Sequence, residues 1–146
     1  MHIVKIDRER PDFRVFIDLL FGPGWEVDTE GNSHPVNSRT WTSLYMADRT
    51  HKEPSVTIEA SEDDPELFEV ESASTRLEEL AALYLFLCSG SAIVAPDGAL
   101  IDARRVSLQA SYSAELQRAA QALWHQSSDS NPYPNLTAFR RPTGAT

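Results

Sequence analysis

The sequence has little of what a secreted or membrane protein requires. It contains one cysteine, Cys88, so no intrachain disulfide bond is possible. The longest nearly unbroken apolar run, from Leu80 to Cys88, is about half as long as a membrane-spanning helix. The start of the chain is polar and mixed in charge, unlike a signal segment. We therefore expect a cytoplasmic protein, most simply of a bacterial type of cytoplasm, that does not bind membranes.

Positive charge is scarce as well. The chain has 13 Lys and Arg residues against 22 Asp and Glu residues, which gives a net charge of −9. A field of this sign repels phosphates, so nucleic acid is not expected as a partner. Two basic pairs, Arg104-Arg105 and Arg140-Arg141, are a weak signal in the other direction, because arginine near aromatic residues occurs in nucleic-acid sites. The alternative is that these arginines pair with acidic side chains of the same chain.

No motif for a cofactor, a metal ion or a catalytic centre is present. The glycines around Gly22 and Gly90 lack the phosphate-loop pattern and follow predicted helices, whereas phosphate loops precede helices. The acidic run from Glu62 to Glu66 lacks the spacing of a calcium-binding loop. Cys88 lies in an apolar segment, which is typical of an inert core thiol. We expect no cofactor, no metal site and no catalytic residue, and we predict that the chain is not an enzyme.

The alternative is a small enzyme or ligand-binding domain whose site is assembled from distant residues. The four histidines show no paired spacing, so such a site depends on the fold to bring its groups together. It predicts a concave pocket that holds convergent polar groups with shifted pKa values. The candidates for this site are Asp48, His51, Glu59 and Glu69.

Alternating apolar and polar residues predict several short strands. They cover residues 2–6, 25–28, 39–47, 55–60 and 67–72, and the short polar connections between the later ones favour antiparallel pairing. A tight hairpin is expected around Pro96-Asp97-Gly98, joining residues 92–95 to 99–101. Residues 29–38 are predicted to form a loop, and residues 103–110 are predicted to be extended.

Helical periodicity predicts three helices. The first follows Pro11, has an apolar stripe from Phe13 to Leu20 and ends at Gly22, although a strand over residues 13–17 is an alternative. The second begins at a Ser74 or Thr75 cap, with Thr75-x-x-Glu78 spaced as in a capping box. It is apolar nearly all round, which places it at the centre of the core. The third begins at Ser113, with a stripe from Leu116 to Trp124.

These elements predict an α+β fold. A single domain over residues 1–126 is expected, in which a mainly antiparallel sheet of about five to six strands packs against about three helices. Hydrophobic residues make up 41% of the 146, enough for a core of this size, to which Trp41 and Trp124 are assigned. Residues 127–146 are predicted to form a polar, proline-containing tail, in which residues 136–139 suit a short edge strand.

The negative charge is concentrated in one stretch. Between Glu53 and Thr75 there are eight acids and no base, whereas the rest of the chain holds 14 acids and 13 bases. On the predicted strands, Glu59, Glu69 and Glu71 share the outward face, where like charges on neighbouring strands destabilise a sheet. Binding of a cationic partner over this face offsets this loss of stability, which would explain why the acids are there. A solvated face that keeps an edge from aggregating is the alternative.

We therefore predict a non-enzymatic, acidic protein-binding domain, an inhibitor or immunity-type protein that neutralises a basic partner such as a toxin or nuclease. A nuclease active site is cationic because it binds phosphates, so an acidic surface steers association with it. Trp25 is added because tryptophan is enriched in binding hot spots. A homodimer, joined through edge strands or the apolar second helix, is a further hypothesis. The predicted partner-binding residues are Glu59, Glu62, Asp63, Asp64, Glu66, Glu69, Glu71 and Trp25.

Overall fold

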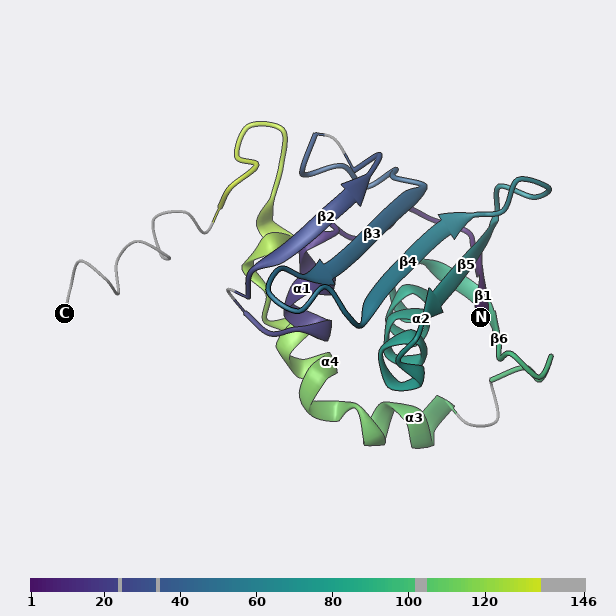
Figure 1. Ribbon diagram of the computed structural model, residues 1–146. Coiled ribbons are helices and arrows are strands. Elements are labelled where there is room, and N and C mark those ends of the chain that lie inside the picture. The colour runs from purple at the N-terminus through teal and green to yellow at the C-terminus, as the bar shows by residue number, and fades with distance from the viewer. Residues whose placement is uncertain (24, 34, 102–104, 135–146) are drawn as a thin grey trace.

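Six strands form one antiparallel sheet in the order β2-β3-β4-β5-β1-β6 (Figure 1). The computed structural model describes residues 1–23, 25–33, 35–101 and 105–134. The β4–β5 pair is a hairpin, and β1 lies between β5 and the edge strand β6, so the start of the chain forms an interior strand of the sheet. The strands are β1 (His2–Ile6), β2 (Val27–Gly31), β3 (Ser43–Asp48), β4 (Ser55–Ala60), β5 (Leu67–Ser72) and β6 (Gly90–Val94).

Helices cover one face of this sheet. In the described part of the chain they are α1 (Arg14–Leu20), α2 (Thr75–Ser89), α3 (Arg105–Ser111) and α4 (Ser113–Ala120), followed by a 3-10 turn, η2 (Leu123–Gln126). Figure 1 shows α1, α2 and α4 on the same side of the strands. The helix α2 is central, because every residue from Leu80 to Phe86 is buried and the helix contacts β1, β5 and β6. The predicted α+β fold, with its antiparallel sheet and its central second helix, is confirmed.

The core lies between α2 and the sheet. Alternate strand residues point toward the helices and are almost fully buried, as the period of two in the sequence predicts. Trp41 joins them, with its ring edge-on to Phe16 and Phe68, and its indole N–H donates to the Pro11 carbonyl at 2.9 Å. The assignment of Trp41 to the core is confirmed. The buried strand residues are Val4, Ile6, Leu44, Met46, Val56, Ile58, Phe68, Val70 and Ile93.

Two predicted strands have other boundaries. β3 runs over Ser43–Asp48 rather than over 39–47. β2 runs over Val27–Gly31 rather than 25–28, because its alternating contacts with β3 continue into the residues predicted as loop. Gly31 has a φ of 134°, and a Cβ there would lie 2.1 Å from the Ser43 carbonyl oxygen, so this glycine permits the close approach of β2 to β3. The predicted hairpin after β6 forms around Pro96-Asp97-Gly98: Val94 and Leu100 make a bridge, and the Ile101 N–H donates to the Ile93 carbonyl at 3.1 Å. Its second arm, residues 99–101, is too short to count as a strand.

The helical predictions were partly right. Residues 14–20 are helical, so the alternative strand over 13–17 is wrong. The extended segment predicted over residues 103–110 is also wrong from Arg105 onward, where α3 forms; residues 103 and 104 lie outside the described residues. Leu108 is the one buried residue of α3, so the helix leaves no apolar stripe for periodicity to detect. The third predicted helix ends at Ala120, and Leu123, predicted to be in its stripe, is 41% exposed in η2.

Ser74 caps α2, but the predicted capping box does not form. The Ser74 hydroxyl oxygen accepts a hydrogen bond from the Leu77 N–H at 3.2 Å. The carboxylate of Glu78 instead contacts His2 Nδ1 at 2.5 Å and accepts from the Ser72 N–H at 3.2 Å. Because His2 belongs to β1 and Ser72 ends β5, this buried carboxylate ties α2 to two neighbouring strands.

Acid is expected to weaken this tie. Burial by itself raises the pKa of Glu78, but hydrogen bonds from His2 and the Ser72 N–H outweigh it and hold the pKa below its usual value. The stabilisation is therefore complete above the unfolded-state pKa, roughly 4.3, and is lost as the pH falls through the lower folded-state pKa. We expect Glu78→Gln to unfold more easily than wild type at pH 7, with the difference narrowing toward pH 3. Chemical denaturation across this range measures it; a difference that does not change with pH contradicts the prediction.

The described part of the predicted tail packs against the start of α1. The Ser127 hydroxyl donates to Asp12 Oδ2 at 2.6 Å, and Arg14 Nη2 donates to the Pro132 carbonyl at 2.6 Å. The Arg14 guanidinium also lies over the Trp124 ring, 4.0 Å from its centroid. Residues 127–134 are therefore anchored to the domain, while the predicted edge strand over 136–139 lies outside the described residues.

Candidate partner-binding surface

The sheet face turned away from the helices, here called the open face, carries acids on β2, β4 and β5. In the described part of the chain no helix lies over it (Figure 1). Strand register places the outward side chains in rows, because directly paired residues point to the same side. One row crosses β3, β4 and β5, and a second crosses β2 to β5. The first row holds Ser43, Glu59 and Glu69, and the second holds Glu30, Tyr45, Thr57 and Glu71.

Glu59 and Glu69 face each other directly. They are paired residues of the β4–β5 hairpin, so their side chains leave the sheet side by side on the open face. Glu59 is exposed and Glu69 half-buried. Within the described residues, neither forms an ion pair with a lysine, arginine or histidine. The like-charge opposition expected from the sequence therefore exists without an ion-paired base among the described residues. The nearest base on this face is the exposed Lys5 of β1, which pairs with Leu67 and so lies diagonally to Glu69.

This pair is expected to reduce stability. Replacing Glu69 by Lys turns a like-charge pair into an opposite-charge pair, and cross-strand pairs of this kind contribute roughly 0.2–1 kcal/mol. We expect Glu69→Lys to raise the free energy of unfolding by up to about 1 kcal/mol at low salt, with a smaller gain at high salt. Urea denaturation at two salt concentrations measures the change. A loss of stability, or a gain that salt does not affect, contradicts the prediction.

The second row adds an acid that the sequence analysis missed. Glu30 pairs with Tyr45, whose other neighbour Thr57 pairs with Glu71, so both ends of the row are carboxylates. Glu30 and Glu71 are exposed, and Tyr45 and Thr57 are half-buried. The Gly, Asn, Ser and Pro content of residues 29–38 predicts a loop, so composition alone does not place Glu30 on the sheet. The alternation of Val27, Asp28, Thr29 and Glu30 is the signal that places it on the sheet.

The turn between β4 and β5, residues 61–66, is called the acidic turn. Asp64 Oδ1 accepts a hydrogen bond from the Glu66 N–H at 3.0 Å, and the Asp64 carbonyl accepts from the Leu67 N–H at 3.0 Å. Asp64 therefore shapes the turn and is half-buried, whereas Glu62, Asp63 and Glu66 are exposed. Three of the four predicted partner-binding acids in this turn are thus free to meet a partner, and the fourth also has a structural contact.

Trp25 lies away from the acidic turn. It precedes β2 next to the end of β3, and the acidic turn lies at the opposite end of the sheet. Trp25 is 51% exposed, and its indole N–H donates to Asp48 Oδ2 at 2.7 Å. Hydrogen bonds from the His51 backbone N–H and from Trp25 lower the pKa of Asp48 to about 2. The ionised Asp48 carboxylate thus holds the Trp25 indole in place, while about half of the Trp25 surface faces solvent.

The four candidates for an assembled catalytic site separate into two pairs. His51 Nδ1 lies 3.4 Å from Asp48 Oδ1, and the His51 side chain is 74% exposed. Asp48 ends β3, whereas Glu59 pairs with Ser43 at its beginning, so the two pairs are roughly 17 Å apart at about 3.4 Å per residue. The fold does not bring the four side chains to one place.

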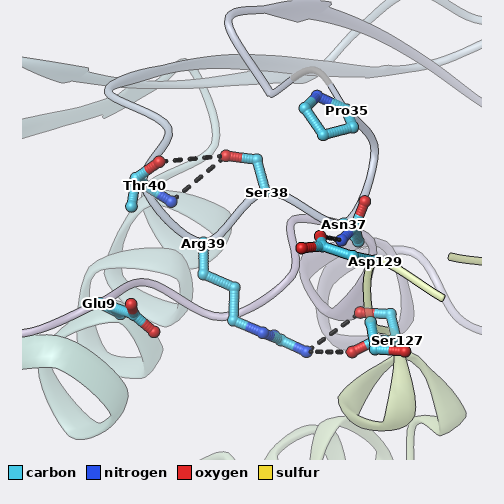
Figure 2. Close-up of a pocket in the computed structure, with 9 residues that line it drawn as sticks. Glu9, Pro35, Asn37, Ser38, Arg39, Thr40, Ser127 and Asp129 are labelled. Atoms are coloured by element: carbon cyan, nitrogen blue, oxygen red, sulfur yellow. Dashed lines mark hydrogen bonds between the residues drawn. The ribbon is translucent and has the colours of Figure 1, made fainter. Parts of the chain in front are cut away.

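A hollow of about 520 Å³ lies elsewhere, between the 35–40 loop and the chain after η2. Figure 2 shows Arg39 reaching across it, where Nη2 donates to the Ser127 carbonyl at 3.1 Å and hydroxyl at 3.0 Å. Beside it, Asn37 donates to Asp129 at 2.9 Å. Several of the polar groups that line this hollow therefore bind one another, and none of the four catalytic candidates lines it.

Other features of the described residues bear on the remaining hypotheses. Within residues 1–23, 25–33, 35–101 and 105–134, no three His, Cys, Asp or Glu side chains gather as a metal ion requires, and no helix has the length and apolar character to cross a membrane. Most apolar residues of α2 are buried, whereas Leu87 and Cys88 near its end are half-buried. Burial raises the pKa of Cys88, which fits an unreactive thiol. The basic residues Arg104, Arg140 and Arg141 lie outside the described residues.

Comparison with known proteins finds no family model, no curated protein and no solved structure that matches this chain significantly.

Proposed function

We propose that this chain is a non-enzymatic binding protein that neutralises a basic protein partner, in the manner of an inhibitor or immunity protein. The observation that carries the proposal is the direct opposition of Glu59 and Glu69 on an uncovered sheet face without an ion-paired base among the described residues. Such an arrangement costs stability in the free protein, and a cationic partner removes the cost when it binds.

The surface suits a partner whose positive charge is spread over an area. Glu30 and Glu71 flank the central pair on the open face, and the acidic turn extends the charge beyond the end of the hairpin. Half-buried Tyr45 and Thr57 lie between the carboxylates and supply contact area and hydrogen-bonding groups. A protein that binds phosphates, such as a nuclease, has a cationic surface of the complementary sign, and long-range attraction raises the rate of association.

Trp25 is a second contact in this proposal. Because Asp48 already accepts its N–H, the indole loses little freedom when a partner packs against its face. Its position beyond the edge of the open face means that a partner touching both Trp25 and the acidic turn spans β2 to β5. This extent implies a folded protein partner of domain size.

Co-purification from the native host, with variants of matched charge, tests the proposal. In one variant Glu59 and Glu69 become Lys, and in the control Glu9 and Asp97, exposed acids outside the open face, become Lys. Each substitution adds two positive units, so both variants move the net charge from −9 to −5. The first variant keeps a like-charge pair on β4 and β5, so its stability is expected to stay near that of wild type.

We expect wild type and the control to retain a basic protein that 0.5 M salt releases, and the Glu59 and Glu69 variant to lose it. Retention by both variants overturns the role of the open face. The acidic turn is tested separately by changing Glu62, Asp63 and Glu66 to Lys, which leaves the Asp64 hydrogen bond in place. If that triple variant retains the basic partner as well as wild type does, the acidic turn is not part of the binding surface.

A further inference from the structure

The hollow of about 520 Å³ beside η2, here called the loop hollow, has walls that are fixed by hydrogen bonds. Arg39 Nη2 donates to the Ser127 carbonyl and hydroxyl, and Asn37 Nδ2 donates to Asp129 Oδ1 (Figure 2). These bonds join two distant segments of the chain. Asn37 is 9% exposed and Ser127 is 8% exposed, so both walls belong to the packed domain. The loop hollow is therefore preformed, which is usual for small-molecule sites.

Several polar atoms that line the loop hollow have no hydrogen-bond partner among the described residues. Asn37 Oδ1 and Asp129 Oδ2 are unused, because the bond between these side chains joins Nδ2 to Oδ1. Arg39 donates through Nη2 alone, which leaves Nε and Nη1 unused. The Glu9 carboxylate is exposed and accepts no bond from these residues either. The loop hollow thus offers an incoming molecule both acceptors and donors.

The charges of these groups disfavour an ion as the ligand. The described lining holds two carboxylates, those of Glu9 and Asp129, and one base, Arg39. An anion such as phosphate meets more negative than positive charge, and a simple cation is repelled by the guanidinium. A divalent metal ion needs about six oxygen ligands with converging carboxylates, more than this lining supplies. An uncharged molecule with many hydrogen-bonding groups suits the lining better.

An apolar hollow of about 270 Å³ adjoins the loop hollow and shares lining residues with it. Tyr133 is 50% exposed, so its ring offers a face to an incoming molecule. The neighbouring Pro132 carbonyl accepts a hydrogen bond from Arg14 Nη2 at 2.6 Å, which fixes the chain beside this ring. The polar site therefore continues onto an apolar platform. Apart from the shared Asn37 and Asp129, the apolar hollow is lined by Pro35, Val36, Pro132 and Tyr133.

A sugar matches both hollows. Each sugar hydroxyl donates one hydrogen bond and accepts others, so it can satisfy carboxylate, amide and guanidinium groups without carrying charge. The C–H faces of a sugar ring are apolar and pack against an aromatic ring. We propose that the loop hollow binds a neutral oligosaccharide, with one ring among Asn37, Arg39 and Asp129 and the next ring over Tyr133. This site shares no lining residue with the acidic open face, so it does not depend on the proposed function.

Nuclear magnetic resonance of the full chain labelled with nitrogen-15 tests the site. The probes are cellobiose, maltose, lactose and sucrose, each at about 20 mM, which detects a Kd of about 1–10 mM. We expect at least one of them to shift the signals of the Asn37 side-chain amide and the Ser128 backbone amide. If none of the four disaccharides shifts these signals, the proposal is wrong.

Variants of exposed side chains then locate the sugar. We expect Tyr133→Ala, which removes the aromatic platform, to weaken binding about tenfold or more, and Glu9→Ala, which removes one acceptor, to weaken it about threefold. Trp25→Ala removes another half-exposed aromatic side chain, outside both hollows, and is expected to bind as wild type does. Glu9→Ala keeps the test valid if Tyr133→Ala disturbs the walls.

Two further results contradict the proposal. Binding that neither Tyr133→Ala nor Glu9→Ala weakens places the sugar elsewhere on the protein. Glutamine serves as a zwitterionic probe at the same concentration, because its ammonium and carboxylate groups match the acids and the guanidinium of the lining. If glutamine shifts the Asn37 and Ser128 signals and the disaccharides do not, the site binds an amino acid instead of a sugar.

Discussion

Arg14→Met is expected to lower the free energy of unfolding by about 3–5 kcal/mol, the range for removing one partner of a buried ion pair. Arg14 Nη2 lies 2.7 Å from Asp12 Oδ2, and both residues are buried, Asp12 completely. Without the guanidinium, the Asp12 carboxylate remains in the interior with only the Arg14 backbone N–H and the Ser127 hydroxyl as donors. The anchor of residues 127–134 through the Pro132 carbonyl is lost as well.

Two comparisons isolate the buried charge. Arg8→Met removes an exposed pair with Asp7 and is expected to cost about 0–1 kcal/mol. Combining Asp12→Asn with Arg14→Met removes both charges and is expected to recover part of the loss. Urea denaturation, followed by circular dichroism, measures the free energy of unfolding of these three variants. If Arg14→Met lowers the free energy of unfolding no more than Arg8→Met does, the buried Asp12–Arg14 pair does not stabilise the start of α1.

Trp41→Ala is expected to lower the free energy of unfolding by a similar amount, roughly 3–5 kcal/mol, which is the range for removing a large buried aromatic side chain. Trp41 is 1% exposed, and its ring centroid lies 6.0 Å from that of Phe16 and 6.2 Å from that of Phe68. The change leaves a cavity between α1 and the sheet and leaves the Pro11 carbonyl without its indole donor.

Trp25→Ala is the matched control. Trp25 is half exposed, so the same substitution there is expected to cost about 1 kcal/mol or less. Thermal unfolding of both variants gives the comparison. Equal effects at the two positions contradict the assignment of Trp41 to the core and of Trp25 to the surface.

The acidic hairpin was predictable because its information is local. Val56, Ile58, Phe68 and Val70 alternate with polar residues, and a period of two fixes which side chains leave the sheet together. The short turn at residues 61–66 then makes a hairpin the simplest connection. The opposition of Glu59 and Glu69 additionally depends on strand register, which a change of one residue in the turn shifts to the other face.

What the sequence did not reveal depends on distant contacts or on weak periodicity. Glu30 joins the open face only because β2 pairs with β3 as far as Gly31, a glycine that composition alone assigns to a loop. The contacts of Ser127 with Asp12 and of Arg14 with Pro132 join residues more than a hundred positions apart, and no local pattern connects them. The separation of Trp25 from the acidic turn likewise follows from strand order.

The acidic open face is tested most directly by titrating the purified basic partner into three proteins: wild type, the Glu59 and Glu69 double lysine variant, and the Glu9 and Asp97 control. We expect calorimetry at 0.15 M salt to show affinity about 100-fold weaker for the double variant and within about threefold of wild type for the control. Equal weakening of both variants would mean that net charge alone governs binding. An unchanged affinity in the double variant would mean that the partner binds elsewhere, and either result contradicts a binding site centred on Glu59 and Glu69.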